Sequence, residues 1–155
     1  MRHLPFFLTL AAGLPWSIAA SPAPAAVKRP PQHHAAGMPA SARQFYATTW
    51  GVDELSVKLA ESGQLVRFNY RVIDKAKAAP LNSRASSPEM LDERAHVVLQ
   101  VPTMEKVGPL RQSMTPEEGY VYWILFSNKG EFVKAGHQVS VLIGPVRIDG
   151  LVVQK

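Results

Sequence analysis

The chain has 155 residues, which is the length of a single domain. Its 17 Lys and Arg residues outnumber its 12 Asp and Glu residues, but Arg2, Lys28 and Arg29 all precede the first acidic residue, Asp53. The remaining chain is nearly neutral, which argues against nucleic-acid binding, because that function needs positive charge clustered on the folded domain. The chain has no cysteine, which excludes disulfides, thiolate metal sites and a thiol nucleophile.

The N-terminus has the pattern of a secretory signal peptide over residues 1–19. A charged start, Met1-Arg2-His3, is followed by an apolar run from Leu4 to Ala20 that ends in small residues. The run contains Pro5 and Pro15 and is short for a membrane span, which needs ~20 residues. The sequence therefore predicts a periplasmic or secreted protein, in contact with the membrane only if the leader stays uncleaved.

Residues 20–44 are rich in Pro and Ala and poor in large apolar side chains. Such a segment buries too little surface to offset the entropy of ordering, so a disordered or polyproline-like tether is predicted. His33, His34 and Met38 suggest a weak copper or nickel site. A solvated linker is the preferred interpretation, because two adjacent histidines supply too few ligands for a specific site.

The first predicted strands cover residues 53–60 and 65–73, with a turn at 61–63. The second strand alternates between an apolar and a polar face: Val66, Phe68, Tyr70 and Val72 against Arg67, Asn69 and Arg71. We expect the apolar face in the core and the basic side chains in solvent rather than in a binding patch. Trp50, Trp123 and the tyrosines are expected in the core or at its edge rather than in a stacking platform.

The middle of the chain is harder to interpret. Residues 74–88 are polar and rich in Ala and Ser, which predicts a long connection with room for a short edge strand. Short strands are predicted at 89–92 and 96–101. Residues 102–119 show no strand pattern, although a helical turn is possible at 104–107. A structureless segment of this length is usually functional or mobile.

The last third, residues 120–153, holds three apolar runs of strand length separated by Gly, Asn and Pro. The run 120–126 is apolar without alternation, as expected of a central strand covered on both faces. Together these patterns predict an all-β domain over residues 45–155, an immunoglobulin-like antiparallel β-sandwich of about seven to eight strands. A small closed barrel is the alternative.

No catalytic motif occurs in the sequence: it has no nucleophile elbow, no zinc-protease helix signature and no glycine-rich phosphate or dinucleotide loop. We therefore predict a non-enzymatic protein without a cofactor. The alternative function is periplasmic copper handling, in which thioether and imidazole groups would bind Cu(I). The candidate ligands for that alternative are His96, Met104, Met114 and His137.

The best candidate for a binding surface is the 102–119 loop, which mixes cationic and apolar side chains between predicted strands. The residues proposed to contact a partner are Thr103, Met104, Lys106, Leu110, Arg111 and Gln112. The competing interpretation is a structural crossover in which Val107 and Leu110 cap the core, and the sequence does not separate the two. The predicted partner is a protein or a component of the cell envelope.

The pattern over Trp50–Val153 resembles a family of small exported bacterial proteins of unassigned function. The segments that carry the resemblance are Trp50-Gly51-Val52, Arg67-Phe68-x-Tyr70-Arg71-Val72-x-Asp74, Val101-Pro102-Thr103-Met104-x-Lys106-Val107-Gly108-x-Leu110-Arg111-Gln112, Phe126-x-Asn128, Val133-x-x-Gly136, Ile143-Gly144 and Leu151-x-Val153. The resemblance implies an exported β-domain, and it implies no activity, cofactor or catalytic residue.

Overall fold

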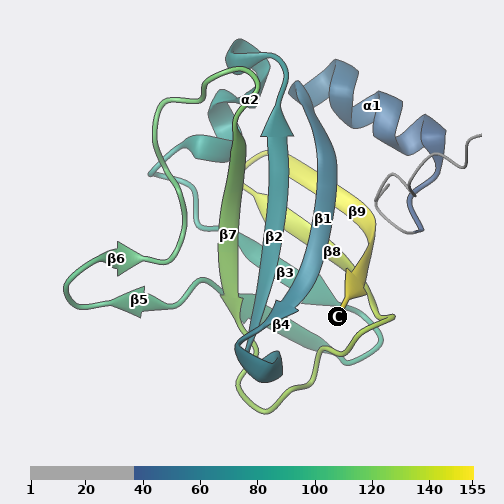
Figure 1. Cartoon of the computed structure of the whole chain (residues 1–155), viewed down its shortest axis with the longest axis vertical. Helices are drawn as coiled ribbons and strands as arrows, with labels where there is room; N and C mark the ends of the chain where they lie inside the picture. Colours follow the sequence, from purple (N-terminus) through teal and green to yellow (C-terminus); the bar gives the residue numbers. More distant parts are fainter. Residues whose placement is uncertain (1–36) are drawn as a thin grey trace, which may run out of the picture. The chain divides into compact units, whose positions relative to one another are not determined.

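The computed structural model describes residues 37–155. The predicted signal peptide, most of the predicted tether and the His33–His34 pair lie outside the described residues. The elements, drawn in Figure 1, are the helices α1 (Ala40–Trp50) and α2 (Lys75–Asn82), the short 3-10 helix η1 (Glu61–Gly63), and the strands β1 (Val52–Ala60), β2 (Leu65–Val72), β3 (Glu89–Asp92), β4 (Val97–Gln100), β5 (Thr103–Met104), β6 (Gly108–Pro109), β7 (Val121–Ser127), β8 (Gln138–Ile143) and β9 (Val146–Gln154). Among residues 37–155, no helix combines the length and the apolar character needed to cross a bilayer.

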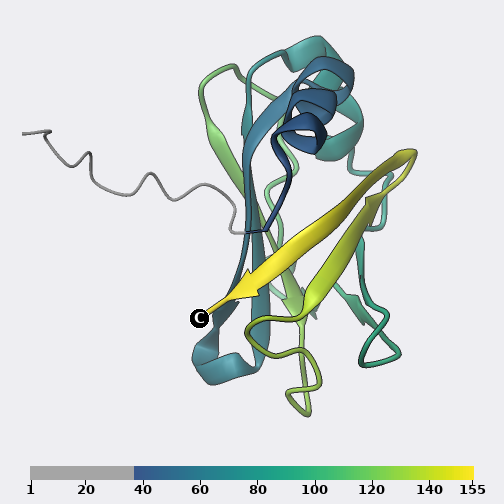
Figure 2. The ribbon, with the colours of Figure 1, turned by 90° about the vertical axis from the view of Figure 1, so that its right-hand side faces the viewer.

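The domain is mostly β, with 44% of the described residues in strands and 18% in helices. Seven strands form one sheet in the order β4-β3-β8-β9-β1-β2-β7, and β5 and β6 form a separate two-stranded ladder. The seven-stranded sheet curls until it is nearly closed into a barrel, with its two end strands β4 and β7 lying next to each other. Figure 2 shows β8 and β9 crossing obliquely over the layer of β1, β2 and β7.

One pairing departs from the predicted antiparallel arrangement. β1 and β9 run parallel, with Val57 opposite Val153 and Lys58 opposite Gln154, so the sheet is mixed. The other pairs in the sheet are antiparallel. The prediction of a purely antiparallel fold is wrong at this pair, because the partner strand of β1 comes from the far end of the chain and local sequence carries no signal for its direction.

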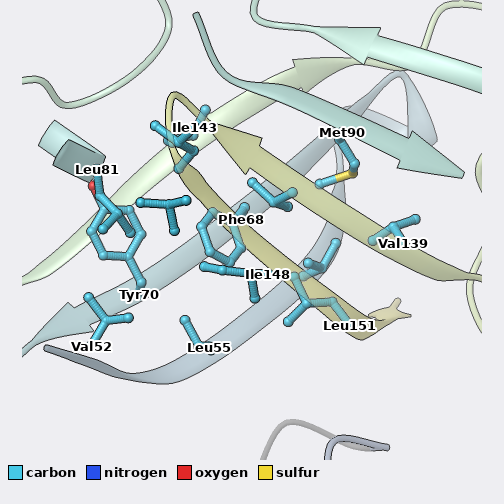
Figure 3. Close-up of a cluster of buried hydrophobic side chains, with 14 of the residues drawn as sticks. Val52, Leu55, Phe68, Tyr70, Leu81, Met90, Val139, Ile143, Ile148 and Leu151 are labelled. Atoms are coloured by element: carbon cyan, nitrogen blue, oxygen red, sulfur yellow. The ribbon is translucent and has the colours of Figure 1, made fainter. Parts of the chain in front are cut away.

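The core is built from alternating side chains of β2 and of the strands around it, and Figure 3 shows part of this cluster. Val66, Phe68, Tyr70 and Val72 are fully buried, whereas the basic residues of β2 point outward. This confirms the predicted facing of the strand. Burying a side chain of this size contributes about 1.5–3 kcal/mol.

β7 does not have the predicted environment. Tyr122, Ile124 and Phe126 are buried, but Val121 is exposed and Trp123 is only half-buried, so one face of the strand is covered rather than two. The strand is also at one end of the sheet instead of its centre. Its outward apolar residues belong to a partly solvated face; there the Arg67 guanidinium lies 5.5 Å from the centre of the Trp123 ring.

Helix α1 replaces the end of the predicted tether. It begins at Ala40, and both Met38, just before it, and Tyr46 within it are buried against the core. The Tyr46 hydroxyl oxygen accepts a hydrogen bond of 2.9 Å from the backbone N–H of Asp149. The helix ends at Gly51 in a left-handed conformation (φ 62°), and a Cβ there would lie 2.6 Å from the Asp74 carbonyl oxygen, so this position requires glycine.

Helix α2 replaces the predicted long connection. The Asp74 carboxylate accepts hydrogen bonds from the backbone N–H groups of Ala76 and Lys77, at 3.0 and 3.2 Å, and so caps the helix. The bond from Lys77 is the main cause that lowers the pKa of Asp74. The helix buries Ala78 and Leu81, so this segment packs on the core instead of crossing the surface as a loop.

Candidate functional site

The segment predicted to lack regular structure contains a two-stranded arm. β5 pairs with β6 through Thr103–Pro109 and Met104–Gly108, and a turn at residues 105–107 replaces the predicted helical turn. Gly108 takes a left-handed conformation (φ 75°) that allows the chain to return after this turn. Figure 1 shows the arm projecting away from the seven-stranded sheet.

The arm leaves large apolar side chains in solvent. Met104 is 53% exposed and Val107 is 68% exposed, and Lys106 between them is also exposed. The predicted role of Val107 in capping the core is therefore wrong. An ordered segment that exposes apolar groups beside a cation has the composition of a contact surface.

The next three residues leave the arm and run along β7. The backbone N–H of Gln112 donates to the Trp123 carbonyl (3.1 Å), and the Leu125 N–H donates to the Leu110 carbonyl (3.0 Å). The Gln112 side-chain oxygen accepts a further bond from the Trp123 N–H at 3.1 Å. Of the six predicted contact residues, Thr103, Met104 and Lys106 thus lie in or beside the arm strands, whereas Leu110, Arg111 and Gln112 cover the edge of the sheet.

Arg111 has a structural role that its sequence position did not reveal. Its Nη1 donates to the Ser86 carbonyl at 2.7 Å and its Nη2 donates to the Leu81 carbonyl at 2.8 Å. The arginine therefore fastens the end of α2 and the loop after it to the strand-like segment beside β7. Its buried Nε–H has no hydrogen-bond partner among residues 37–155, and burial lowers the pKa of the guanidinium.

A cleft of about 630 Å³ opens at the base of the arm. Thr103, Val107 and Pro109 from the arm line it together with Arg111 and Ser113, so the structure brings five residues of the 102–119 segment to one site. The opposite wall was not predicted; it comes from the loop between α2 and β3, with Arg84, Ser86 and Ser87, and from Glu89 in β3. The dense run of Ser and Arg at 83–87 was the available signal.

The groups behind Arg111 are neutral. The Tyr70 hydroxyl donates to the Asn82 side-chain oxygen at 2.8 Å, and burial raises the pKa of Tyr70 well above its ordinary range. The Asn82 amide nitrogen has no partner among the described residues. Tyr70 therefore stays a phenol at neutral pH and supplies no negative charge to the guanidinium.

The structure does not bring the four candidate copper ligands together in one cluster. The His137 imidazole Nδ1 lies 2.5 Å from Oδ2 of the buried Asp92, and His96 is the last residue of the turn after Asp92. Met104 lies in the arm, which continues from the opposite end of the β3–β4 pair, where Glu89 lies beside Gln100. Met114 is exposed in the loop before β7. Residues 37–155 contain no group of three or more His, Cys, Asp or Glu side chains placed to hold a metal ion.

Comparisons of the chain with protein-family models, with curated proteins and with solved structures find no match. The resemblance to a family of small exported bacterial proteins therefore stays a prediction.

Proposed function

We propose that the chain is an exported, non-enzymatic β-domain that binds a protein or another component of the cell envelope through the β5–β6 arm. The observation that carries the proposal is the exposure of Met104 and Val107 on an arm that is hydrogen-bonded but does not pack them into the core. Solvent-exposed apolar groups on a rigid scaffold lower their free energy by being covered by a partner.

The residues proposed to contact the partner differ from the six residues that the sequence predicted. Met104, Lys106 and Val107 form the exposed contact surface, and Thr103 connects it to the cleft. Arg111 and Gln112 support the surface from behind through their hydrogen bonds to the body of the domain. Substituting Arg111 would therefore mix a folding effect with a binding effect, so the test uses the exposed arm residues.

The experiment is capture of partners from an envelope extract by the tagged full-length chain. The variant Met104→Ser with Val107→Ser should lose a captured partner that the unmodified chain retains. Phe45→Ser is the matched control, because Phe45 is 56% exposed on α1, on the other side of the molecule in Figure 1. Equal capture by all three proteins would show that the arm is not the contact surface.

Copper handling is the weaker candidate, because the His137 imidazole contacts Asp92 and the two methionines lie in other segments. It has a direct test in titration of the full-length chain with Cu(I). Binding that is lost in a His137→Ala, Met104→Ala double variant would favour it over the arm proposal.

The immunoglobulin-like sandwich is likewise a proposal about the fold. It is supported by the two groups of strands that face each other across one core, β1, β2 and β7 against β3, β8 and β9 (Figure 2). The barrel description is supported by the continuous strand order, in which β9 pairs with both β8 and β1.

A further inference from the structure

Two arginines line the cleft at the base of the arm, and neither is paired with a carboxylate. The Arg84 Nε donates to the Ser113 carbonyl at 3.2 Å, and Arg111 donates to two backbone carbonyls. Within residues 37–155, no carboxylate oxygen lies within ion-pair distance of either guanidinium. The cleft therefore holds two cations whose described protein partners are neutral.

Other arginines of the same domain form ion pairs with carboxylates. Arg71 bonds to Asp53 at 2.8 Å, and Arg147 bonds to Asp149 at 2.8 Å. Arg147 and Asp149 line a second cleft, together with Arg94 and Glu93, so the charges of that cleft are balanced. In the cleft at the base of the arm, by contrast, the arginines are not paired with any described carboxylate and can bind an anion.

The guanidinium of Arg111 is held in place before any ligand arrives. Its two bonds to carbonyl oxygens fix its plane, and its neighbour Tyr70 stays uncharged because burial raises the pKa of the phenol. A cation that is partly removed from water and fixed in direction gains more from an incoming anion than a freely solvated one does.

The rest of the lining supplies hydrogen-bond donors. Ser87, Thr103 and Ser113 carry hydroxyl groups, each of which can donate one hydrogen bond to an anionic oxygen, whereas the Ser86 hydroxyl donates to the Pro80 carbonyl at 3.5 Å. The volume of about 630 Å³ lies within the range of about 300–1,000 Å³ that is usual for ligand sites. Glu89 lines the same cleft and opposes an anion, which makes it a useful counter-test.

We propose that this cleft binds an oxyanion, a carboxylate or phosphate group carried by the ligand that the arm contacts. The inference rests on the proposed function for the identity of the ligand, but not for the binding of the anionic group itself. Arg84 and Arg111 supply the charge, and the serine and threonine hydroxyls supply the orientation. The arm then covers the apolar part of the same ligand.

The test is a titration of the full-length, isotope-labelled chain with sodium phosphate and, separately, with sodium acetate, at constant ionic strength balanced with sodium chloride. Backbone amide shifts are followed by NMR. We expect saturable shifts at Ser86, Ser87, Thr103 and Ser113, with one of the two anions binding more tightly and so identifying the group. Saturation with neither anion, or shifts spread evenly over the surface, would overturn the proposal.

Substitutions of Arg84 and of Glu89 should change the affinity for the anion in opposite directions. Arg84→Gln, which removes an exposed charge, should weaken the anion's binding about tenfold, because a hydrogen bond to a charged group is of that size. Glu89→Gln should strengthen it severalfold. Arg94→Gln in the second cleft is the control and should leave the dissociation constant unchanged. Equal effects of Arg84→Gln and Arg94→Gln would mean that only general surface charge is involved.

The outcome is separable from that of the arm proposal. If neither anion binds but the Met104→Ser, Val107→Ser variant still loses its partner, the oxyanion inference is wrong and the arm proposal stands. If an anion binds as expected but the arm variant retains every partner, the cleft is a binding site and the arm proposal is wrong.

Discussion

β2 and the β5–β6 arm both combine apolar and cationic side chains, but β2 buries its apolar side chains and the arm exposes them. Every second side chain of β2 is fully buried, and the strand has a partner on each side, β1 and β7. Each strand of the arm has two residues and one partner, and Met104 and Val107 remain in solvent. The strand therefore sets the stability of the domain, whereas the arm is free to be specialised for contact. Substitutions should accordingly separate the two regions into one that controls folding and one that controls binding.

The largest effect is expected at the centre of the core. Phe68→Ala should lower the free energy of unfolding by about 3–5 kcal/mol, because the ring is fully buried and its removal leaves a cavity. Denaturant unfolding measures this directly. An unchanged midpoint would show that Phe68 does not pack as described.

The next effect is expected where the arm segment is fastened to the body. Arg111→Ala should cost about 2 kcal/mol, because hydrogen bonds to a charged group contribute about 1.5–3 kcal/mol and the unpartnered Nε–H subtracts from that gain. Arg84→Ala is the matched control, since its single bond is exposed. If both variants unfold at the same denaturant concentration as the unmodified chain, Arg111 is not a structural fastening.

A smaller effect, which depends on pH, is expected at the start of α2. The pKa of Asp74 is lowered in the folded state, chiefly by the hydrogen bond from the Lys77 N–H, so folding favours the ionised carboxylate. Its contribution is fully present above the pKa of the unfolded chain and is lost as the pH falls through the lower folded value. The difference in melting temperature between the unmodified chain and Asp74→Ala should therefore shrink in acid.

Asp74→Asn sharpens the same comparison. Asparagine can still cap the helix through its side-chain oxygen but carries no charge. The melting temperature of Asp74→Asn should be closer to that of the unmodified chain than the melting temperature of Asp74→Ala is. It should lack the part of the pH dependence in acid that the Asp74 carboxylate contributes. A difference between Asp74→Ala and the unmodified chain that grows in acid would contradict the sign of the pKa shift.

The smallest effect on stability is expected in the arm. Val107→Ser removes an exposed side chain, so the free energy of unfolding should change by no more than about 0.5 kcal/mol. Thermal unfolding provides the measurement. A loss as large as that of a core substitution would mean that Val107 caps the core after all.

The sequence predicted the elements whose pattern is local. The alternation of β2 specified its buried and solvated faces, and the short β3 was also predicted correctly. α1 was missed because Met38 and Tyr46 bury themselves against distant strands, and its own sequence has no clear apolar stripe. α2 was missed because Pro80 argues against a helix interior, although Asp74 and the Ala and Lys residues after it favour a helix.

The candidate site was predicted only on one side, in the arm and at Arg111. Thr103, Met104 and Lys106 were identified from mixed composition, but the other wall of the cleft comes from residues that are adjacent only in space. The carbonyls that bind Arg111 lie 25 and 30 residues before it in the chain, at Ser86 and Leu81. Backbone acceptors have no sequence signature, so the fastening role of Arg111 could not be read from composition or spacing.

The most direct test of the account is site-specific photocrosslinking in the intact chain. A benzophenone amino acid replaces Val107 in the arm in one protein and Phe45 on α1 in another, since both positions are exposed in solvent. We expect a discrete crosslinked partner from position 107 and none from position 45. The same adducts from both positions, or none from position 107, would contradict the claim that the arm is the binding surface.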